Sequence, residues 1–152
     1  MFKKILLPVD GTEFALQTAE IVAEQCTTVP GAHITLVVAI ALENKNHSGL
    51  DEEVIRRQNE RIRRHAEDAL RTVASIFERR GVPHTAKIIE GDPTSAAVAQ
   101  EAETGEYDLI AMGSRGLGMQ RNDVHYSGSV TEHVIRRVRI PVLVIPIHPE
   151  CE

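Results

Sequence analysis

The chain has no excess of basic residues and no long apolar run. Of its 152 residues, 17 are Lys or Arg and 22 are Asp or Glu, which gives a net charge of −5. Domains that bind nucleic acid usually carry a basic excess, so this balance argues against a nucleic-acid partner. No run of apolar residues approaches the length that a membrane-spanning helix needs, so we expect no membrane insertion.

Cysteine is also scarce. Cys26 and Cys151 are far apart in the sequence and fit no metal or redox spacing. We therefore expect no disulfide scaffold, and a reducing compartment fits this usage. The apolar stretch at residues 2–8 is too short for a signal peptide. These features predict a cytoplasmic protein with a single domain over residues 1–152, which is long enough to bury a sizeable core.

Several catalytic motifs are missing too. The sequence contains no GxxxxGK[ST] phosphate loop, no GxSxG nucleophile elbow, no HExxH helix and no pair of carboxylates at catalytic spacing. Its seven histidines are scattered, which argues against a zinc site. We assign no catalytic residues and no metal ligands, and the favoured class is a binding protein.

What the chain does have is a regular alternation of strand and helix patterns. Strands are expected at residues 5–9, 34–40, 84–90, 107–112 and 141–146, and helices at residues 13–27, 51–80, 94–103 and 129–138. Residues 43–50 are polar and contain Asn, Ser and Gly, which predicts a mobile loop. This alternation predicts an α/β fold with a doubly wound, five-stranded parallel sheet and helices on both faces.

Local signals suggest how some of these helices begin. Asp92 is expected to cap the helix at residues 94–103, with Pro93 in its first turn. The first third of the long helix is heavily charged. Its arginines could indicate an anion-binding patch, but acidic residues alternate with them, so a solvated, salt-bridged face is the preferred interpretation.

The most informative segment is residues 107–131, YDLIAMGSRGLGMQRNDVHYSGSVT. A buried-strand pattern leads into glycines 113, 116 and 118, whose backbone N–H groups can approach an anion without obstruction by a Cβ. Gly128-Ser129 then opens a helix, whose N-terminus carries free N–H donors and a partial positive charge. This order can build a phosphate site. The alternative is that the glycines only form a tight turn and that Ser129-x-x-Glu132 is only a capping box.

Asp10 lies where a ligand would bind in such a sheet. Ligands of doubly wound sheets bind outside the carboxyl ends of the strands, where the strand order reverses. The strand that leads to Asp10 and the strand that leads to Gly113 should flank that point. Asp10 could accept hydrogen bonds from a ribose or a base amine. It could also cap the following helix, as could Gly11 or Thr12, and the two roles are compatible.

Five segments, taken together and in this order, resemble the universal stress protein family over nearly the whole chain. They are KKILLPVDGTE, GDPTSAAVAQEA, DLIAMGSRGLG, GSVTEHVIRR and IPVLVIP. The resemblance implies the strand order 3-2-1-4-5 and a homodimer formed through the last strand, residues 141–146. It also implies binding of ATP or a related adenine nucleotide, with little or slow hydrolysis, and a role in stress response or signalling. Mg²⁺ or Mn²⁺ could accompany the phosphates, and the protein partner is not implied.

The resemblance extends to individual residues. Asp10 resembles the carboxylate on the adenosine side, and Ala39 resembles the position whose backbone meets the adenine edge. Gly113 and Gly116 match the first two motif glycines, and residues 128–130 match the phosphate-side end. The complete expected nucleotide-binding set is Pro8, Val9, Asp10, Ala39, Met112, Gly113, Arg115, Gly116, Gly128, Ser129 and Val130.

One spacing departs from the family pattern. Eleven residues separate Gly116 from Gly128, where the pattern has nine, and the stretch is unusually polar. We interpret it as a longer, wetter loop over the phosphate side. Two alternatives to nucleotide-dependent signalling remain open. One is a slow ATP hydrolase that uses Arg115, Arg121 and His125, and the other is a scaffold member of the family that binds no nucleotide.

Overall fold

Five parallel strands form a single sheet in the computed structural model, which describes residues 2–114 and 129–147. The strands are β1 (Lys4–Pro8), β2 (His33–Ile40), β3 (His84–Glu90), β4 (Leu109–Gly113) and β5 (Val142–Ile145). The helices are α1 (Glu13–Cys26), α2 (Lys45–Ser48), α3 (Glu52–Arg79), α4 (Thr94–Thr104) and α5 (Ser129–Arg137). The order β3-β2-β1-β4-β5 confirms the predicted doubly wound α/β fold.

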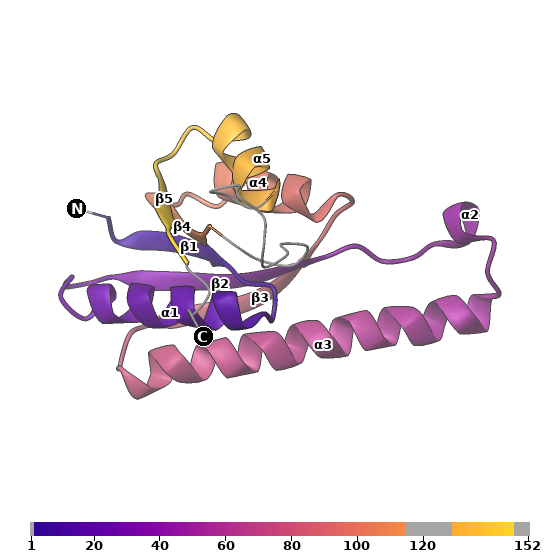
Figure 1. The fold of residues 1–152 in the computed structure, drawn as a ribbon, viewed down its shortest axis with the longest axis horizontal. Helices are drawn as coiled ribbons and strands as arrows, with labels where there is room; N and C mark the ends of the chain where they lie inside the picture. Colours follow the sequence, from indigo (N-terminus) through magenta and orange to yellow (C-terminus); the bar gives the residue numbers. More distant parts are fainter. Residues whose placement is uncertain (1, 115–128, 148–152) are drawn as a thin grey trace, which may run out of the picture.

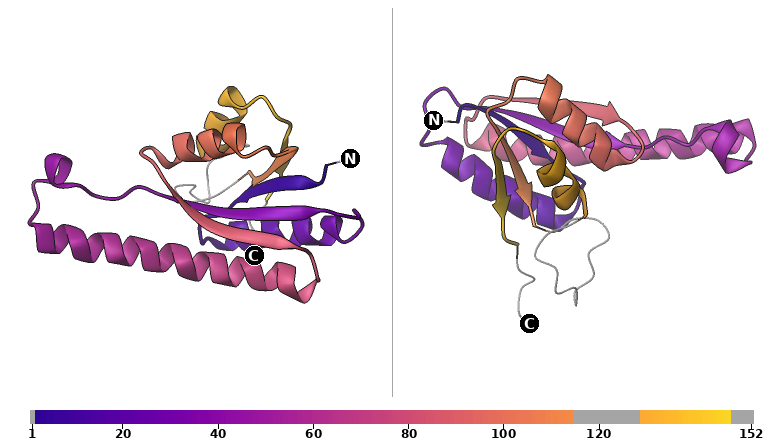
Figure 2. Two further views of the ribbon diagram at one scale, coloured as in Figure 1. Left: turned by 180° about the vertical axis from the view of Figure 1, so that it is seen from behind. Right: turned by 90° about the horizontal axis from the view of Figure 1, so that it is seen from above.

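Helices cover both faces of the sheet, with α1 and α3 on one face and α4 and α5 on the other (Figure 1; Figure 2). Alternate residues of each strand therefore enter different cores. Leu7 packs in the cluster on the side of α1 and α3, and Leu6 packs in the cluster on the side of α4 and α5. This double burial explains why the central strands are continuous apolar runs rather than alternating patterns.

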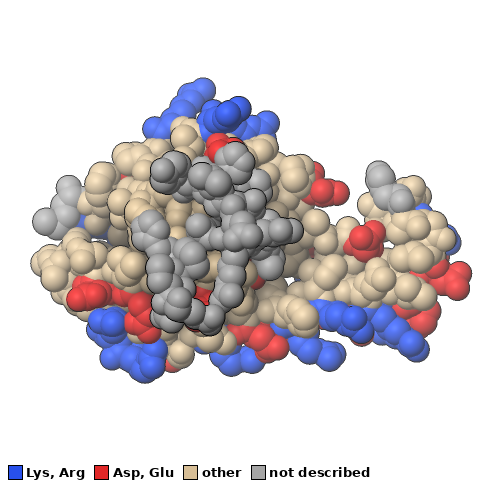
Figure 3. Space-filling model, in the orientation of Figure 1, with Lys and Arg blue, Asp and Glu red and all other residues tan. Residues whose placement is uncertain are grey.

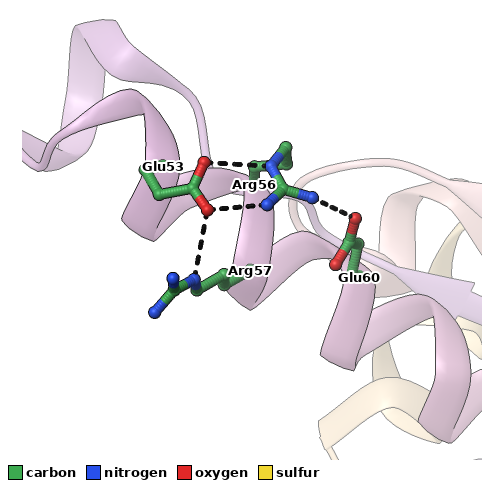
Figure 4. A network of polar contacts seen from close by, with 4 residues as sticks. All are labelled: Glu53, Arg56, Arg57 and Glu60. Atoms are coloured by element: carbon green, nitrogen blue, oxygen red, sulfur yellow. Dashed lines mark hydrogen bonds and ion pairs between the residues drawn. The ribbon is translucent and has the colours of Figure 1, made fainter.

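The helix α3 is long and buries only part of its length against the sheet. Its N-terminal half projects beyond the sheet, together with α2 (Figure 1). Arg56 lies between Glu53 and Glu60 at 2.6 Å from each, and Arg57 lies 3.2 Å from Glu53 (Figure 4). Charges of both signs alternate along this edge of the molecule (Figure 3). The salt-bridged interpretation of this segment is confirmed.

The prediction of a loop at residues 43–50 is wrong in part, because α2 forms one helical turn there. The Asn44 side chain caps this turn by accepting a hydrogen bond from the Asn46 N–H at 3.1 Å. The segment before α2 is fastened to α3 by two reciprocal hydrogen bonds between Glu43 and Asn59, at 2.9 and 3.0 Å. A contact between residues sixteen positions apart is not visible in a local sequence pattern.

The helix α4 begins at Thr94 as expected, but its predicted cap is wrong. Pro93 is the N-cap residue itself, with ψ 157°, and the helix makes no side-chain cap hydrogen bond. The Ala96 N–H instead donates to the Pro93 carbonyl oxygen at 3.0 Å. Because the helix begins at Thr94, Asp92 lies one residue before the cap and outside the position from which a side chain can reach the first turn.

The connection from α4 to β4 contains a required glycine, Gly105, and a hydrogen-bonded carboxylate, Asp108. A Cβ on Gly105 would lie 2.8 Å from the Glu101 carbonyl oxygen and would collide with the Tyr107 ring. Asp108 accepts hydrogen bonds from the Lys4 N–H at 2.9 Å and the Lys3 N–H at 3.0 Å, which lower the pKa of its carboxyl group. These bonds fix the start of β4 against β1.

Two expectations drawn from composition can be compared with the described residues. Cys26 is a free, buried cysteine, and burial raises the pKa of its thiol. Cys151 lies outside the described residues. None of the helices described is both long enough and apolar enough to cross a membrane.

Tyr107 generates a pH-dependent prediction. Its phenol donates a hydrogen bond to Glu101 at 2.8 Å, and Glu101 also pairs with Lys87. Burial, followed by the hydrogen bond to Glu101, raises the pKa of Tyr107 from 10.0 to about 12. A raised folded-state pKa means that the neutral phenol contributes stability below pH 10, and that this contribution is lost as the pH rises toward 12.

We therefore expect one of the two tyrosines to ionise about two pH units late in an alkaline titration followed by ultraviolet absorbance. The Tyr107→Phe variant should lack that late phase. Ionisation of both phenols near the ordinary tyrosine pKa in the folded wild type would contradict the described contact.

Candidate functional site

The turn after β1 is built around Asp10. Its Oδ1 atom accepts hydrogen bonds from the Thr12 N–H at 3.0 Å and from the Thr12 hydroxyl at 2.6 Å. The Thr12 hydroxyl oxygen in turn accepts from the Ala15 N–H at 3.2 Å, so Thr12 is the N-cap of α1. Of the three candidate caps, the structure selects Thr12, and Asp10 orients that cap from outside the helix.

Gly11 brings this turn close to α3. Its φ of +79° lies in the left-handed region, which favours glycine because other residues place a Cβ against the backbone there. A Cβ on Gly11 would also lie 3.4 Å from the Cβ of Ala69. The end of β1 and the face of α3 thus approach each other beside Asp10.

A cavity of about 640 Å³ opens at this place. It lies between the turn after β1, the carboxyl end of β2 and one side of α3. This volume is in the range of small-molecule sites, on the order of 300–1,000 Å³. Its lining residues are Asp10, Gly11, Thr12, Leu16, Val38, Ala39, Ile40, Ala41, Ile62, His65, Ala66, Asp68, Ala69, Thr72 and Val73.

The backbone of Ala39 borders this cavity on the β1 side of β2, at a level where β1 has already ended. Even-numbered residues of β2 bond to the β3 side, as in the hydrogen bonds from Ile34 N–H to Pro83 and from Gly91 N–H to Ile40, each 3.0 Å. Odd-numbered residues bond to the β1 side, and the Val9 N–H donates to Val37 at 2.8 Å. By this alternation, Ala39 turns its N–H and its carbonyl oxygen toward the space beyond β1.

The carboxyl end of β4 is joined to α5 and β5 by three hydrogen bonds. The Thr131 hydroxyl donates to the Gly113 carbonyl oxygen at 3.0 Å. The Ser114 N–H donates to Ile145 at 2.9 Å, and the Ser114 hydroxyl oxygen accepts from the Ile147 N–H at 2.9 Å. The Thr131 bond thereby holds the first turn of α5, the positive end of its helix dipole, at the end of β4.

The structure brings together some of the expected binding residues. Asp10 and Ala39 line the same cavity, and Pro8 and Val9 lead into it. Met112 is buried in the cluster on the opposite face of the sheet, and Val130 packs against that cluster. Gly113 is held to α5 through Thr131. The other expected positions, Arg115, Gly116, Gly128 and the side chain of Ser129, lie outside the described residues, as do Arg121 and His125.

The contribution of α3 to the cavity was missing from the sequence analysis. Seven lining residues belong to this helix, including His65, Asp68, Ala69 and Thr72. Ala66 and Ala69 lie at helical spacing on the inner face of α3, a pattern that by itself indicates core packing. Small residues three positions apart on an inner helix face were the available signal, because they leave space where larger side chains would fill it.

A metal site was not expected from the sequence. Over residues 2–114 and 129–147, no group of three His, Cys, Asp or Glu side chains is arranged to hold a metal ion.

Comparison with known sequences identifies the family. Residues 1–146 match the model of the universal stress protein family. A universal stress protein of Synechocystis sp. is 31% identical over 96% of this chain and 87% of its own length. A universal stress protein of Methanocaldococcus jannaschii is 30% identical over 95% of this chain and 82% of its own length.

Solved structures are similar over the same extent. The hypothetical protein MJ0577 is 27% identical, with a TM-score of 0.83 over 99% of both chains. An Arabidopsis thaliana family protein with AMP bound is 19% identical, with a TM-score of 0.68 over 94% of this chain and 90% of that chain. A universal stress protein in complex with cAMP is 18% identical, with a TM-score of 0.68 over 95% and 97%. On the family match and the curated relatives, this chain belongs to the universal stress protein family.

Proposed function

We propose that this chain binds ATP or a related adenine nucleotide in the cavity between β1, β2 and α3. The observation that carries the proposal is the backbone N–H and carbonyl pair of Ala39, which faces the cavity that Asp10 also lines. Family members with bound AMP and cAMP support it. Nucleotide occupancy would act in stress response or signalling by changing the interaction with a protein partner.

Adenine fits the hydrogen-bonding groups of Ala39. The adenine 6-amino group donates and the neighbouring N1 accepts, so the edge matches one backbone carbonyl oxygen and one backbone N–H. Guanine presents a carbonyl oxygen and an N–H at the same two positions. In the same pose, its acceptor would face the Ala39 carbonyl and its donor would face the Ala39 N–H. A site that pairs with one edge strongly rejects the inverted edge, because buried polar groups are left unpaired.

The remaining parts of the nucleotide extend from this base position. Asp10 is a carboxylate at the end of β1, oriented by Thr12, and suits the hydroxyl groups of a ribose. The phosphates would reach the end of β4 at Gly113 and the first turn of α5, where N–H donors and the helix dipole favour anions. Mg²⁺ or Mn²⁺ would enter with the phosphates, and we assign no protein ligands to it.

We further propose a cytoplasmic homodimer that pairs through β5. This strand lies at one end of the sheet order, next to β4. Its Leu143 side chain is 48% exposed, which is unusual for an apolar residue in the middle of a strand. Pairing of β5 with the same strand of a second copy would cover this residue and complete the strand's hydrogen bonding.

The base-recognition argument predicts selectivity between purines. In calorimetric titrations, ATP should bind at least about tenfold more tightly than GTP, because two hydrogen bonds are inverted at Ala39 and each contributes about 1 kcal/mol. ATP and GTP carry the same ribose and triphosphate, so any difference in their affinities reports on the base alone. Equal affinity for ATP and GTP would contradict recognition of the base edge by Ala39.

Filling the cavity from α3 should weaken binding of the adenosine part. Ala69→Leu places a larger side chain in the cavity, and we expect adenosine affinity to fall about tenfold or more. Glu67→Leu is the matched control, because Glu67 is exposed on the same helix and does not line the cavity. Thermal melting of both variants checks that the fold is retained. A folded Ala69→Leu variant with unchanged adenosine affinity would place the base elsewhere.

A further inference from the structure

Two buried hydroxyl groups hold the end of β4, and the cavity does not use either of them. Thr131 is 4% exposed and Ser114 is 6% exposed. Thr131 lies in the first turn of α5 and bonds back to Gly113, the last residue of β4. Ser114 follows Gly113 directly and accepts from the Ile147 N–H beyond β5. Neither position was among the residues expected to bind a ligand.

These bonds have a geometric consequence for the proposed site. The Thr131 bond sets where the first turn of α5 lies relative to β4. Ser114 ties the same point to β5 through its N–H and to the segment after β5 through its hydroxyl oxygen. A phosphate that accepts hydrogen bonds at both Gly113 and the α5 N-terminus needs these two groups at a fixed separation. Hydrogen-bonding groups that are already fixed in position bind a ligand more tightly than groups that must first be ordered.

The two parts of the site are supported by different elements. The adenosine part is lined by β2, α3 and the turn after β1. The hydroxyl pair belongs to the connection among β4, β5 and α5. Removing a hydroxyl of the Thr131–Ser114 pair therefore leaves the residues that line the adenosine part in place. Contacts to the phosphates can then be weakened separately from contacts to the adenosine.

We propose that Thr131 and Ser114 are positioning residues for the phosphate side of the nucleotide site. They act through Gly113 and the first turn of α5, which they hold together, and they do not themselves touch the adenosine. The inference rests on the proposed adenine-nucleotide function. It assigns to two buried hydroxyl groups a role in setting affinity for the phosphates.

The experiment compares ATP with adenosine by calorimetry in hydroxyl-deletion variants. Thr131→Val removes the hydroxyl while keeping the side-chain volume, and Ser114→Ala removes the second hydroxyl independently. Each should weaken ATP binding about three- to tenfold, the effect of losing about one net hydrogen bond. Adenosine affinity should stay within about twofold of the wild type. Thr131→Ser keeps the hydroxyl and should restore most of the ATP affinity.

Thr18→Val is the matched control for a merely structural effect. Thr18 is 2% exposed, and its hydroxyl donates to the Phe14 carbonyl oxygen at 2.9 Å, a bond much like that of Thr131. This variant should lose stability without changing the ratio of ATP affinity to adenosine affinity. Melting temperatures of all variants show whether their stability losses are comparable.

The outcomes separate the two proposals. If wild-type protein binds ATP and adenosine but Thr131→Val weakens both equally, or neither, the positioning role is overturned while the nucleotide function stands. If the wild type binds neither ligand, the proposed function itself fails. If the Thr131→Val variant misfolds, Ser114→Ala and Thr131→Ser decide the question. An unchanged ratio of ATP affinity to adenosine affinity in a folded Ser114→Ala variant counts against the inference.

Discussion

The different lengths of two neighbouring parallel strands create the site. β1 ends at Pro8, and its last bond to β2 is made by Val9, whereas β2 continues to Ile40 along β3. A parallel ladder alternates its bonds between the two neighbours of a strand, so the early end of β1 leaves the backbone of Ala39 facing open space. Every other feature of the site is arranged around this gap. Asp10 follows the end of β1 and lines this gap, and α3 forms its side wall.

The two parts of the proposed site lie on different elements of the fold. The cavity proposed for the adenosine lies on the face of the sheet that α1 and α3 cover, where α3 presents small residues. The position proposed for the phosphates is the end of β4, where Thr131 and Ser114 join three elements. Both parts meet at the carboxyl edge of the sheet, where β1 and β4 are neighbours. A ligand with a flat aromatic base, a ribose and an anionic tail matches this sequence of environments.

The sequence predicted the sheet because five strand patterns alternate with four helix patterns. β3 agrees with its expected bounds at residues 84–90. The sequence did not predict α2, and the contact that fastens the preceding segment to α3, between Glu43 and Asn59, is not visible in a local pattern. The strand pattern and the family resemblance pointed to Asp10 and Ala39, which line one cavity, but nothing pointed to its wall of His65, Ala69 and Thr72. Periodicity shows which side of a helix faces inward, and not whether that side meets a core or a cavity.

The most direct test of this account is mass spectrometry of the small molecules released when freshly purified, undialysed protein is denatured. The account predicts an adenine nucleotide in the released fraction, because the cavity, the Ala39 edge and the β4 end together suit that ligand. Protein that releases none, and that also fails to bind added ATP in calorimetry, would contradict it.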